Sequence, residues 1–285
     1  RRVPVQARAQ GGLHVPHRPR RAAARAALGA LLPRQRGPLL RLRPRAAGND
    51  RQRLHRLALL RPPNPKPEET AWGSISLMDA EKRLLANALL DFSNERFVLL
   101  SESCIPLHSF RAVYDYLIGS RHSFVEVYFQ QTKQCQGRYS RRMAPAIRLP
   151  QWRKGSQWFE LSRDLAIDVL ADTKYYPLFR RHCRPSCYPD EHYLPTTVNM
   201  LHGARNANRT VTYVDWSKGG AHPAKYTAGN VTAAAIQGIR RRGWRNDRPC
   251  YYNQRPTSMC FLFARKFAPD TLGPLLNMSS AVMGY

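Results

Sequence analysis

The sequence predicts an α/β fold in which a mixed, mainly parallel sheet is flanked by helices. Short apolar or β-branched runs, which suit buried strands, alternate with segments whose apolar residues recur every three to four positions, as on one face of a helix. Strands that alternate with helices pair mainly in parallel, because a helical crossover returns the chain to the same end of the sheet. At 285 residues the chain is long enough to bury a core.

An arginine-rich segment precedes the predicted folded part. Residues 1–61 contain sixteen Arg, no Lys and one acid, Asp50, and they lack Phe, Tyr, Trp, Ile, Ser, Thr, Cys and Met. Such a composition builds neither a core nor a strand, so we expect a disordered tail that does not pack on the core, or coding sequence read in the wrong frame. Residues 62–70 are predicted to be a stiff Pro-rich linker. Residues 71–285 are the expected folded domain, which the family resemblance described below implies to be N-terminally incomplete.

The first half of that domain contains two predicted helices and two predicted strands. Ser76 is the expected N-cap of a helix whose apolar residues lie three to four positions apart. Residues 96–101 are predicted to form a strand, because residues 97–100 are continuously apolar, as in a strand buried on both faces. Residues 109–118 are predicted to form a short helix and residues 123–129 the next strand.

A polar, basic and Pro-punctuated stretch, residues 131–156, divides the domain. It is too long for a simple connection, and long ordered loops often carry function. Beyond it we expect strands at 158–161, 211–216 and 259–263, with Ser162 as the N-cap of the helix that follows the first of them.

The sequence contains no pattern that is typical of a metal site or of a membrane span. The six cysteines do not form paired C-x-x-C units, so we expect disulfides or buried thiols. No apolar run approaches the ~18 residues of a membrane span. No D-x-D is present, whereas Lys and Arg are abundant. A sugar-nucleotide enzyme neutralises its diphosphate leaving group with a metal held by acids or with Lys and Arg, so we expect basic residues, no metal and no cofactor.

The clearest candidate for catalysis lies in residues 187–196, Cys-Tyr-Pro-Asp-Glu-His-Tyr-Leu-Pro-Thr. The Tyr-Pro pair favours extended backbone, Asp190 is the expected N-cap, and Glu191 falls in the first turn of a helix. A helix N-terminus favours the ionised carboxylate that a general base needs, and His192 and Tyr193 are expected to add hydrogen-bonding groups beside it. On spacing alone, the commoner interpretation is that Glu191 only complements the helix dipole.

Five motifs, in this order, resemble one known family. They are Leu-Ser-Glu-Ser-Cys-Ile-Pro at 100–106, Trp-Arg-Lys-Gly-Ser-Gln-Trp-Phe-Glu-Leu-Ser-Arg-Asp at 152–164, Cys-Tyr-Pro-Asp-Glu-His at 187–192, Val-Asp-Trp-Ser-Lys-Gly-Gly-Ala-His-Pro at 214–223 and Cys-Phe-Leu-Phe-Ala-Arg-Lys-Phe at 260–267. Together they are similar to the plant branch of the core-2/I-branching β-1,6-N-acetylglucosaminyltransferases, glycosyltransferase family 14. The resemblance covers about residues 71–285.

The resemblance implies an activity and a location. It implies a GT-A-like fold and a metal-independent, inverting transfer of a sugar, with N-acetylglucosamine as a candidate, from a UDP-sugar to a glycan or glycoprotein acceptor. It also implies a catalytic domain in the Golgi lumen, held at the membrane by an anchor absent from this chain.

Site residues follow from the same motifs. Glu191 matches the family's general base. Among the donor candidates, Lys266 matches the residue that stabilises the UDP diphosphate. The others are its neighbour Arg265 and a second arginine at Arg240 or Arg242. Ser101 and Glu102 are also donor candidates, because they end a predicted strand where ligands of α/β sheets bind. The acceptor candidates are Arg138, Arg141, Arg142, Asp215, Trp216 and His222, the last where animal members place an aromatic contact.

Simpler interpretations stand beside these candidates. Lys266 can be a surface residue after a strand, Asp215 and Trp216 can simply end one, and Trp158 and Phe159 are expected in the core rather than as sugar platforms. A pI of about 10.8 leaves a basic nucleic-acid-binding protein as an alternative function, and a truncated, inactive family member is another. We prefer the transferase and expect no nucleic-acid partner, because much of the positive charge belongs to residues 1–61.

Overall fold

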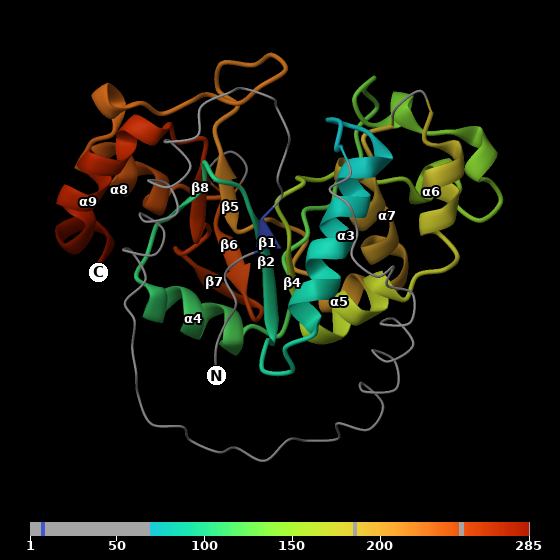
Figure 1. Ribbon diagram of the computed structural model, residues 1–285, viewed down its shortest axis with the longest axis horizontal. Helices are drawn as coiled ribbons and strands as arrows, with labels where there is room; N and C mark the ends of the chain where they lie inside the picture. Colours follow the sequence, from blue (N-terminus) through green and yellow to red (C-terminus); the bar gives the residue numbers. More distant parts are fainter. Residues whose placement is uncertain (1–6, 9–68, 185–186, 245–247, 285) are drawn as a thin grey trace.

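The computed structural model describes residues 7–8, 69–184, 187–244 and 248–284 (Figure 1). Most of the Arg-rich segment and of the Pro-rich linker, where a disordered or misread tail was expected, lies outside the described residues. Ala7–Arg8 is the exception, since it forms strand β1 and pairs in parallel with Leu99 and Leu100.

The described sheets contain both parallel and antiparallel pairs of strands. Their order is β1-β2-β4, β3-β8-β5 and the hairpin β6-β7, with bounds β2 (Arg96–Leu100), β3 (Ile105–Pro106), β4 (Glu160–Ser162), β5 (Thr212–Val214), β6 (Cys250–Tyr252), β7 (Arg255–Thr257) and β8 (Phe263–Arg265). β1 with β2 and β5 with β8 are parallel, whereas β2 with β4, β3 with β8 and β6 with β7 are antiparallel. The α/β class with a mixed sheet is confirmed. Parallel pairing does not predominate among these strands, since three of the five pairs are antiparallel, and one of these three is the hairpin of β6 and β7.

Seven α-helices accompany the described strands. They are α3 (Ile75–Leu89), α4 (Phe110–Gly119), α5 (Arg163–Leu170), α6 (Tyr176–His182), α7 (Pro189–Leu201), α8 (Ala233–Arg241) and α9 (Leu272–Met278). Figure 1 shows α3, α5, α6 and α7 together at one end of the molecule and α8 and α9 beside β8 at the other. One apolar core joins β2 and β4 to the first group of helices, and a second joins β8 to α8 and α9.

Local sequence signals located most helices but not every cap or strand. Helix α4 and the Ser162 cap of α5 are confirmed, since Ser162 accepts a hydrogen bond from the backbone N–H of Leu165. The N-cap of α3 is Ser74 rather than Ser76. Residues 123–129 make isolated bridges to three different segments instead of a regular strand. Among the described residues, no single strand pairs with this whole stretch, so it does not form a regular strand.

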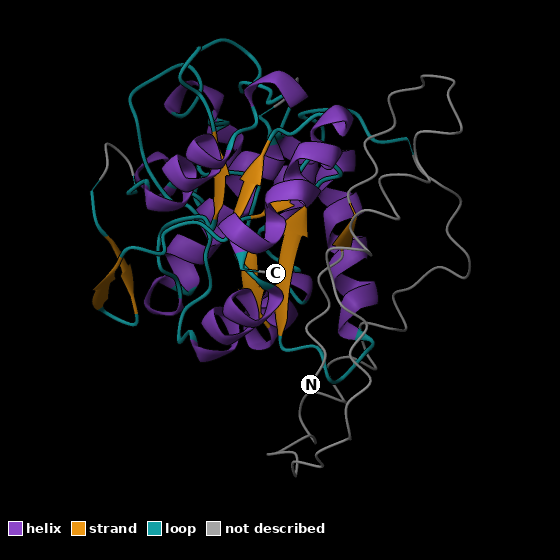
Figure 2. Cartoon of the chain, turned by 90° about the vertical axis from the view of Figure 1, so that its left-hand side faces the viewer, coloured by secondary structure: helices purple, strands orange, loops and turns teal. Residues whose placement is uncertain are grey.

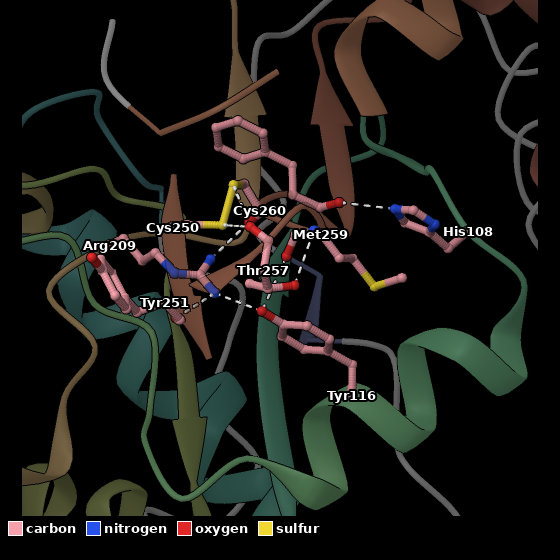
Figure 3. The surroundings of a disulfide bond; sticks show 9 residues. His108, Tyr116, Arg209, Cys250, Tyr251, Thr257, Met259 and Cys260 are labelled. Atoms are coloured by element: carbon pink, nitrogen blue, oxygen red, sulfur yellow. Dashed lines mark hydrogen bonds between the residues drawn. A yellow bond between two sulfur atoms is a disulfide. The ribbon is translucent and has the colours of Figure 1, made fainter. Parts of the chain in front are cut away.

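The cysteines form disulfides and buried thiols, as expected. Cys183 is bonded to Cys187 and Cys250 to Cys260, while Cys104 and Cys135 are buried thiols. In Figure 2 the β6–β7 hairpin stands apart from the central strands. Figure 3 shows how the Cys250–Cys260 bond and Arg209 attach it. Arg209 donates hydrogen bonds to the carbonyl of Tyr251 on the hairpin (3.4 Å), to the carbonyl of Cys260 (2.7 Å) and to the Tyr116 hydroxyl on α4 (2.6 Å).

Candidate active site

The candidate base lies at the beginning of α7. Tyr188 is the N-cap, with a left-handed φ of 52°, and Pro189 is the first helical residue, where its missing N–H costs nothing. Asp190 therefore lies inside the first turn, and its predicted role as N-cap is wrong. Glu191 is in the first turn, as predicted, and the helix continues to Leu201.

Two cations from the long basic loop contact the carboxylate of Glu191. Arg138 Nη1 is 2.8 Å from Oε2, and the Lys154 ammonium pairs with the same oxygen. The Glu191 side chain is 26% exposed and the two cations are 19% and 15% exposed. This arrangement complements a negative charge while leaving the carboxylate in reach of a ligand.

The neighbours of Glu191 on the helix point into the core, so the expectation that they flank its carboxylate is wrong. His192 stacks on Trp152 with ring centres 4.7 Å apart, and its Nδ1 is 3.0 Å from the carbonyl of Tyr188. Burial lowers the pKa of His192 to about 3, which keeps the ring neutral. Tyr193 donates a hydrogen bond of 2.8 Å to Asp172. Both residues fix the helix rather than handle protons of a substrate.

Two more acids lie behind Glu191 and are buried. Burial, and then the nearby charge of Glu191, raise the pKa of Asp190 to about 7. Burial and then the charge of Asp190 raise the pKa of Glu81 on α3 well above its usual value, although Gln157 donates a 2.7 Å hydrogen bond to it. Asp190 Oδ1 and Glu81 Oε2 are buried without a hydrogen-bond partner among the described residues. These environments favour neutral carboxyl groups behind a partly exposed, cation-paired one.

The predicted donor residues that follow β2 and β8 come together. The turn after β2 contains Ser101 and Glu102, and Ser103 in this turn accepts a 2.9 Å hydrogen bond from the backbone N–H of Phe267. The guanidinium of Arg265 lies 4.0 Å from the centre of the Trp158 ring. Burial lowers the pKa of Arg265 while nearby Cys104 and Glu102 oppose this shift, which places Arg265 at the same turn.

The two other arginines proposed for the donor lie in different surroundings. Arg240 donates to the carbonyl of Val282 and contacts His108 Nδ1 at 3.3 Å, so it ties α8 to the C-terminal turn. Arg242 donates a 3.2 Å hydrogen bond to the hydroxyl of Tyr213, on the strand that pairs with β8. Arg242 therefore contacts β5, the strand that pairs with the one that carries Arg265.

The predicted acceptor residues are divided among three places. Arg138 contacts Glu191, whereas Arg141 and Arg142 are exposed on the next short helical turn. Asp215 accepts hydrogen bonds from the Ser217 N–H (2.9 Å) and the Tyr226 hydroxyl (3.3 Å), as expected for a residue that ends a strand and begins a turn. Two aromatic candidates of this loop are exposed, Trp216 and His222.

One short segment, Lys154–Trp158, connects the candidate base to the candidate donor residues. Lys154 pairs with Glu191 at its beginning, and the Trp158 ring lies under Arg265 at its end. Five residues span at most about 18 Å. Gly155 donates a 2.9 Å hydrogen bond to the carbonyl of Glu191, and a Cβ at this position would lie 1.9 Å from the carbonyl oxygen of Glu126. The hydrogen bond holds the segment against α7, and the close approach to the backbone of Glu126 is one that only glycine permits.

Comparisons with known proteins show to which family the chain belongs. The family model of the Core-2/I-Branching enzyme matches residues 63–240, which is more than half of the chain. The chain belongs to this family. The match includes Glu191, Arg138 and Lys154 but ends before Arg265 and Lys266.

A curated plant relative supports the plant branch of this Core-2/I-branching family. Glycosyltransferase BC10 of Oryza sativa subsp. japonica is 37% identical over 251 residues, which cover 73% of this chain and 60% of that protein. The chain thus spans about three fifths of the length of this relative.

Sequence reasoning missed several members of the site. Lys154 was counted only as a basic loop residue, and Glu81 was not singled out although it is an acid on the buried face of a predicted amphipathic helix, a pattern that marks a special environment. Within the described ranges, no helix is long and apolar enough to cross a membrane. In the same ranges, no three acids, histidines or cysteines are grouped to bind a metal ion.

Proposed function

We propose that this chain is an inverting glycosyltransferase that moves a sugar from a UDP-sugar to a hydroxyl of a glycan acceptor, with Glu191 as the general base. The observation that carries the proposal is the pair of contacts at the two ends of Lys154–Trp158. They hold a partly exposed carboxylate at one end and a stacked arginine that suits a diphosphate at the other.

The acceptor side of the reaction uses the free oxygen of Glu191. Both cations contact Oε2, so Oε1 takes the proton of the acceptor hydroxyl as its oxygen bonds to the anomeric carbon. Burial raises the pKa of Glu81 and Asp190 behind it, whereas the carboxylate of Glu191 is partly exposed and contacts two cations. Arg138 and Lys154 also orient the carboxylate, which lowers the cost of reaching the reactive geometry.

The donor side stabilises the departing nucleotide. As the bond from the anomeric carbon to the UDP oxygen breaks, the electron pair leaves with UDP, and the added negative charge falls on the diphosphate. Arg265 and Lys266 supply positive charge for it, with Arg242 on the neighbouring side, so the proposal includes no metal. Attack from the side opposite the leaving group inverts the configuration of the anomeric carbon. N-acetylglucosamine is the sugar suggested by the resemblance.

The proposed location is the Golgi lumen. Two disulfides, Cys183–Cys187 and Cys250–Cys260, suit an oxidising compartment. The acceptor would then be a glycan or a glycoprotein that passes through the secretory pathway, reached by an enzyme held at the Golgi membrane.

The test is transfer from radiolabelled UDP-sugars to a glycan library, with wild-type chain and Glu191→Gln. The Gln side chain keeps the size but cannot accept the proton, so transfer should fall by about 10²–10⁴. UDP affinity should stay within about twofold, because the diphosphate is bound elsewhere. Asp164→Asn is the matched control, since it alters an exposed acid in the first turn of another helix, α5.

Each result separates the alternatives. Wild-type turnover by a folded Glu191→Gln variant removes Glu191 as the base. A wild-type chain that binds UDP but transfers no sugar is the inactive family member considered above. Binding of nucleic acid with no affinity for UDP would favour the basic nucleic-acid-binding protein instead.

A further inference from the structure

An exposed aromatic group lies beside the N-terminus of α7. The Trp72 side chain is 63% exposed, and its ring meets the Tyr188 ring edge to face, with centres 5.0 Å apart and planes at 79°. On another side, the His222 ring centre is 5.8 Å from that of Trp72. Residues from three distant parts of the sequence thus place their rings together. Large exposed aromatic side chains that gather in this way commonly mark a binding surface.

The backbone holds Trp72 in this exposed position. Gly73 follows it with a φ of +71°, and a Cβ on Gly73 would lie 2.7 Å from the Tyr188 ring. The chain therefore runs flat against Tyr188, which only glycine allows. A hydrogen bond of 3.1 Å from the N–H of Ser74 to the carbonyl of Ala71 closes the turn directly before α3. This turn fixes the backbone at Trp72, and its largely exposed ring contacts the rings of Tyr188 and His222.

A continuous set of contacts leads from this aromatic group to the candidate base. Tyr188 also contacts Arg138, whose guanidinium carbon is 3.7 Å from the centre of the Tyr188 ring. Arg138 in turn donates the 2.8 Å hydrogen bond to Glu191. Tyr188 is also only three positions before Glu191, at the cap of the same helix. The exposed face of Trp72 consequently lies at the acceptor side of the proposed reaction.

We propose that Trp72, with Tyr188 and His222, forms a stacking site for a pyranose ring of the acceptor glycan, next to the sugar whose hydroxyl Glu191 deprotonates. This inference rests on the proposed function for the identity of its ligand. A β-linked pyranose presents a face of C–H groups, which pack on an aromatic ring, while its hydroxyls at the edge reach polar neighbours. Arg138 and His222 supply such neighbours here. Because the stacked ring is next to the sugar that reacts, the acceptor contains at least two sugar units.

The experiment measures binding in the absence of donor, so that turnover is not required. Hexasaccharides of β-linked glucose, galactose, xylose and N-acetylglucosamine are titrated into the wild-type chain by calorimetry, and Trp72→Ala and Trp72→Phe are compared on those that bind. We expect at least one of these probes to bind, with affinity about tenfold or more lower for Trp72→Ala and within about threefold for Trp72→Phe. Tyr251→Ala is the matched control, because this aromatic side chain is 57% exposed on the separate β6–β7 hairpin.

The outcomes distinguish this site from the proposed function. Equal affinities of wild-type and Trp72→Ala for a bound probe overturn the stacking site, as does the absence of binding by every probe. Probe binding that depends on Trp72, together with no sugar transfer by the wild-type chain, preserves the site and rejects the proposed activity. Transfer that requires Glu191 but is unaffected by Trp72→Ala at low acceptor concentration preserves the proposed activity and rejects the stacking site.

Discussion

The side chain of Arg138 donates a hydrogen bond of 2.8 Å to Oε2 of Glu191 across a sequence separation of 53 residues. Its guanidinium also lies on the Tyr188 ring, so the aromatic group orients the cation and the cation orients the carboxylate. The long basic loop thereby contributes directly to the candidate active site. Substitutions of these residues should therefore change the activity in specific ways.

Arg138→Ala should lower kcat/KM for the acceptor by roughly 10- to 100-fold, because Glu191 loses one of its two orienting cations. The KM for the donor should hardly change. Arg138→Lys should recover only part of the loss, since an ammonium does not reproduce the planar contact with Tyr188. Steady-state kinetics with either substrate varied provides the measurement. Arg111→Ala is the control, as this arginine is exposed on α4 and pairs with Asp115. A uniform effect on both substrates would contradict the assignment.

Lys266→Ala and Arg265→Ala should each weaken UDP binding by roughly tenfold or more and slow transfer as well. The reason is that these residues supply the charge that binds the diphosphate. Calorimetric titration of UDP measures the first effect and initial rates the second. The Arg265 variant also exposes the Trp158 ring, so its melting temperature must be compared with that of the Lys266 variant. Unchanged UDP affinity in both variants would place the donor elsewhere.

Transfer should persist after dialysis against EDTA, because the proposal assigns the leaving-group charge to basic residues. The rate before and after dialysis, and after addition of Mn²⁺ or Mg²⁺, is the readout. A rate that disappears with the chelator and returns in proportion to added metal would show that a divalent ion carries this charge.

Asp190→Asn should change how stability depends on pH. Burial raises the pKa of Asp190 to about 7, so in the folded state the neutral form is favoured and its stabilising contribution is fully present below about pH 4, the unfolded pKa. It is lost as pH rises through about 7, by an amount on the order of a few kcal/mol. Asn does not ionise, so the variant should gain stability relative to wild type between pH 5 and pH 8.

Denaturant unfolding at those two pH values tests this sign. The comparison must be a difference between variant and wild type, since Glu160 also has a raised pKa, which does not depend on Asp190, and titrates in both proteins. Asp164→Asn, an exposed acid, should leave the difference close to zero at both pH values. A relative stability of Asp190→Asn that falls with pH would mean that Asp190 is ionised in the folded protein.

The sequence by itself determined the elements whose signals are local. The cap of α5 by Ser162, the spacing of apolar residues along α3 and the position of Glu191 in the first turn of α7 all depend on residues within a few positions of one another. The five motifs likewise led to the family, which the family model then established.

Only the tertiary structure decided the partners and the burial of the site residues. Nothing near Glu191 in sequence distinguishes Arg138 from Arg141, yet only the first contacts it among the described residues. Asp190 and Glu191 are adjacent acids, but one is buried behind α3 and the other faces two cations. The reason is physical: the environment of a side chain is set by segments that pack on it from far along the chain, and a local pattern contains no information about which segments these are.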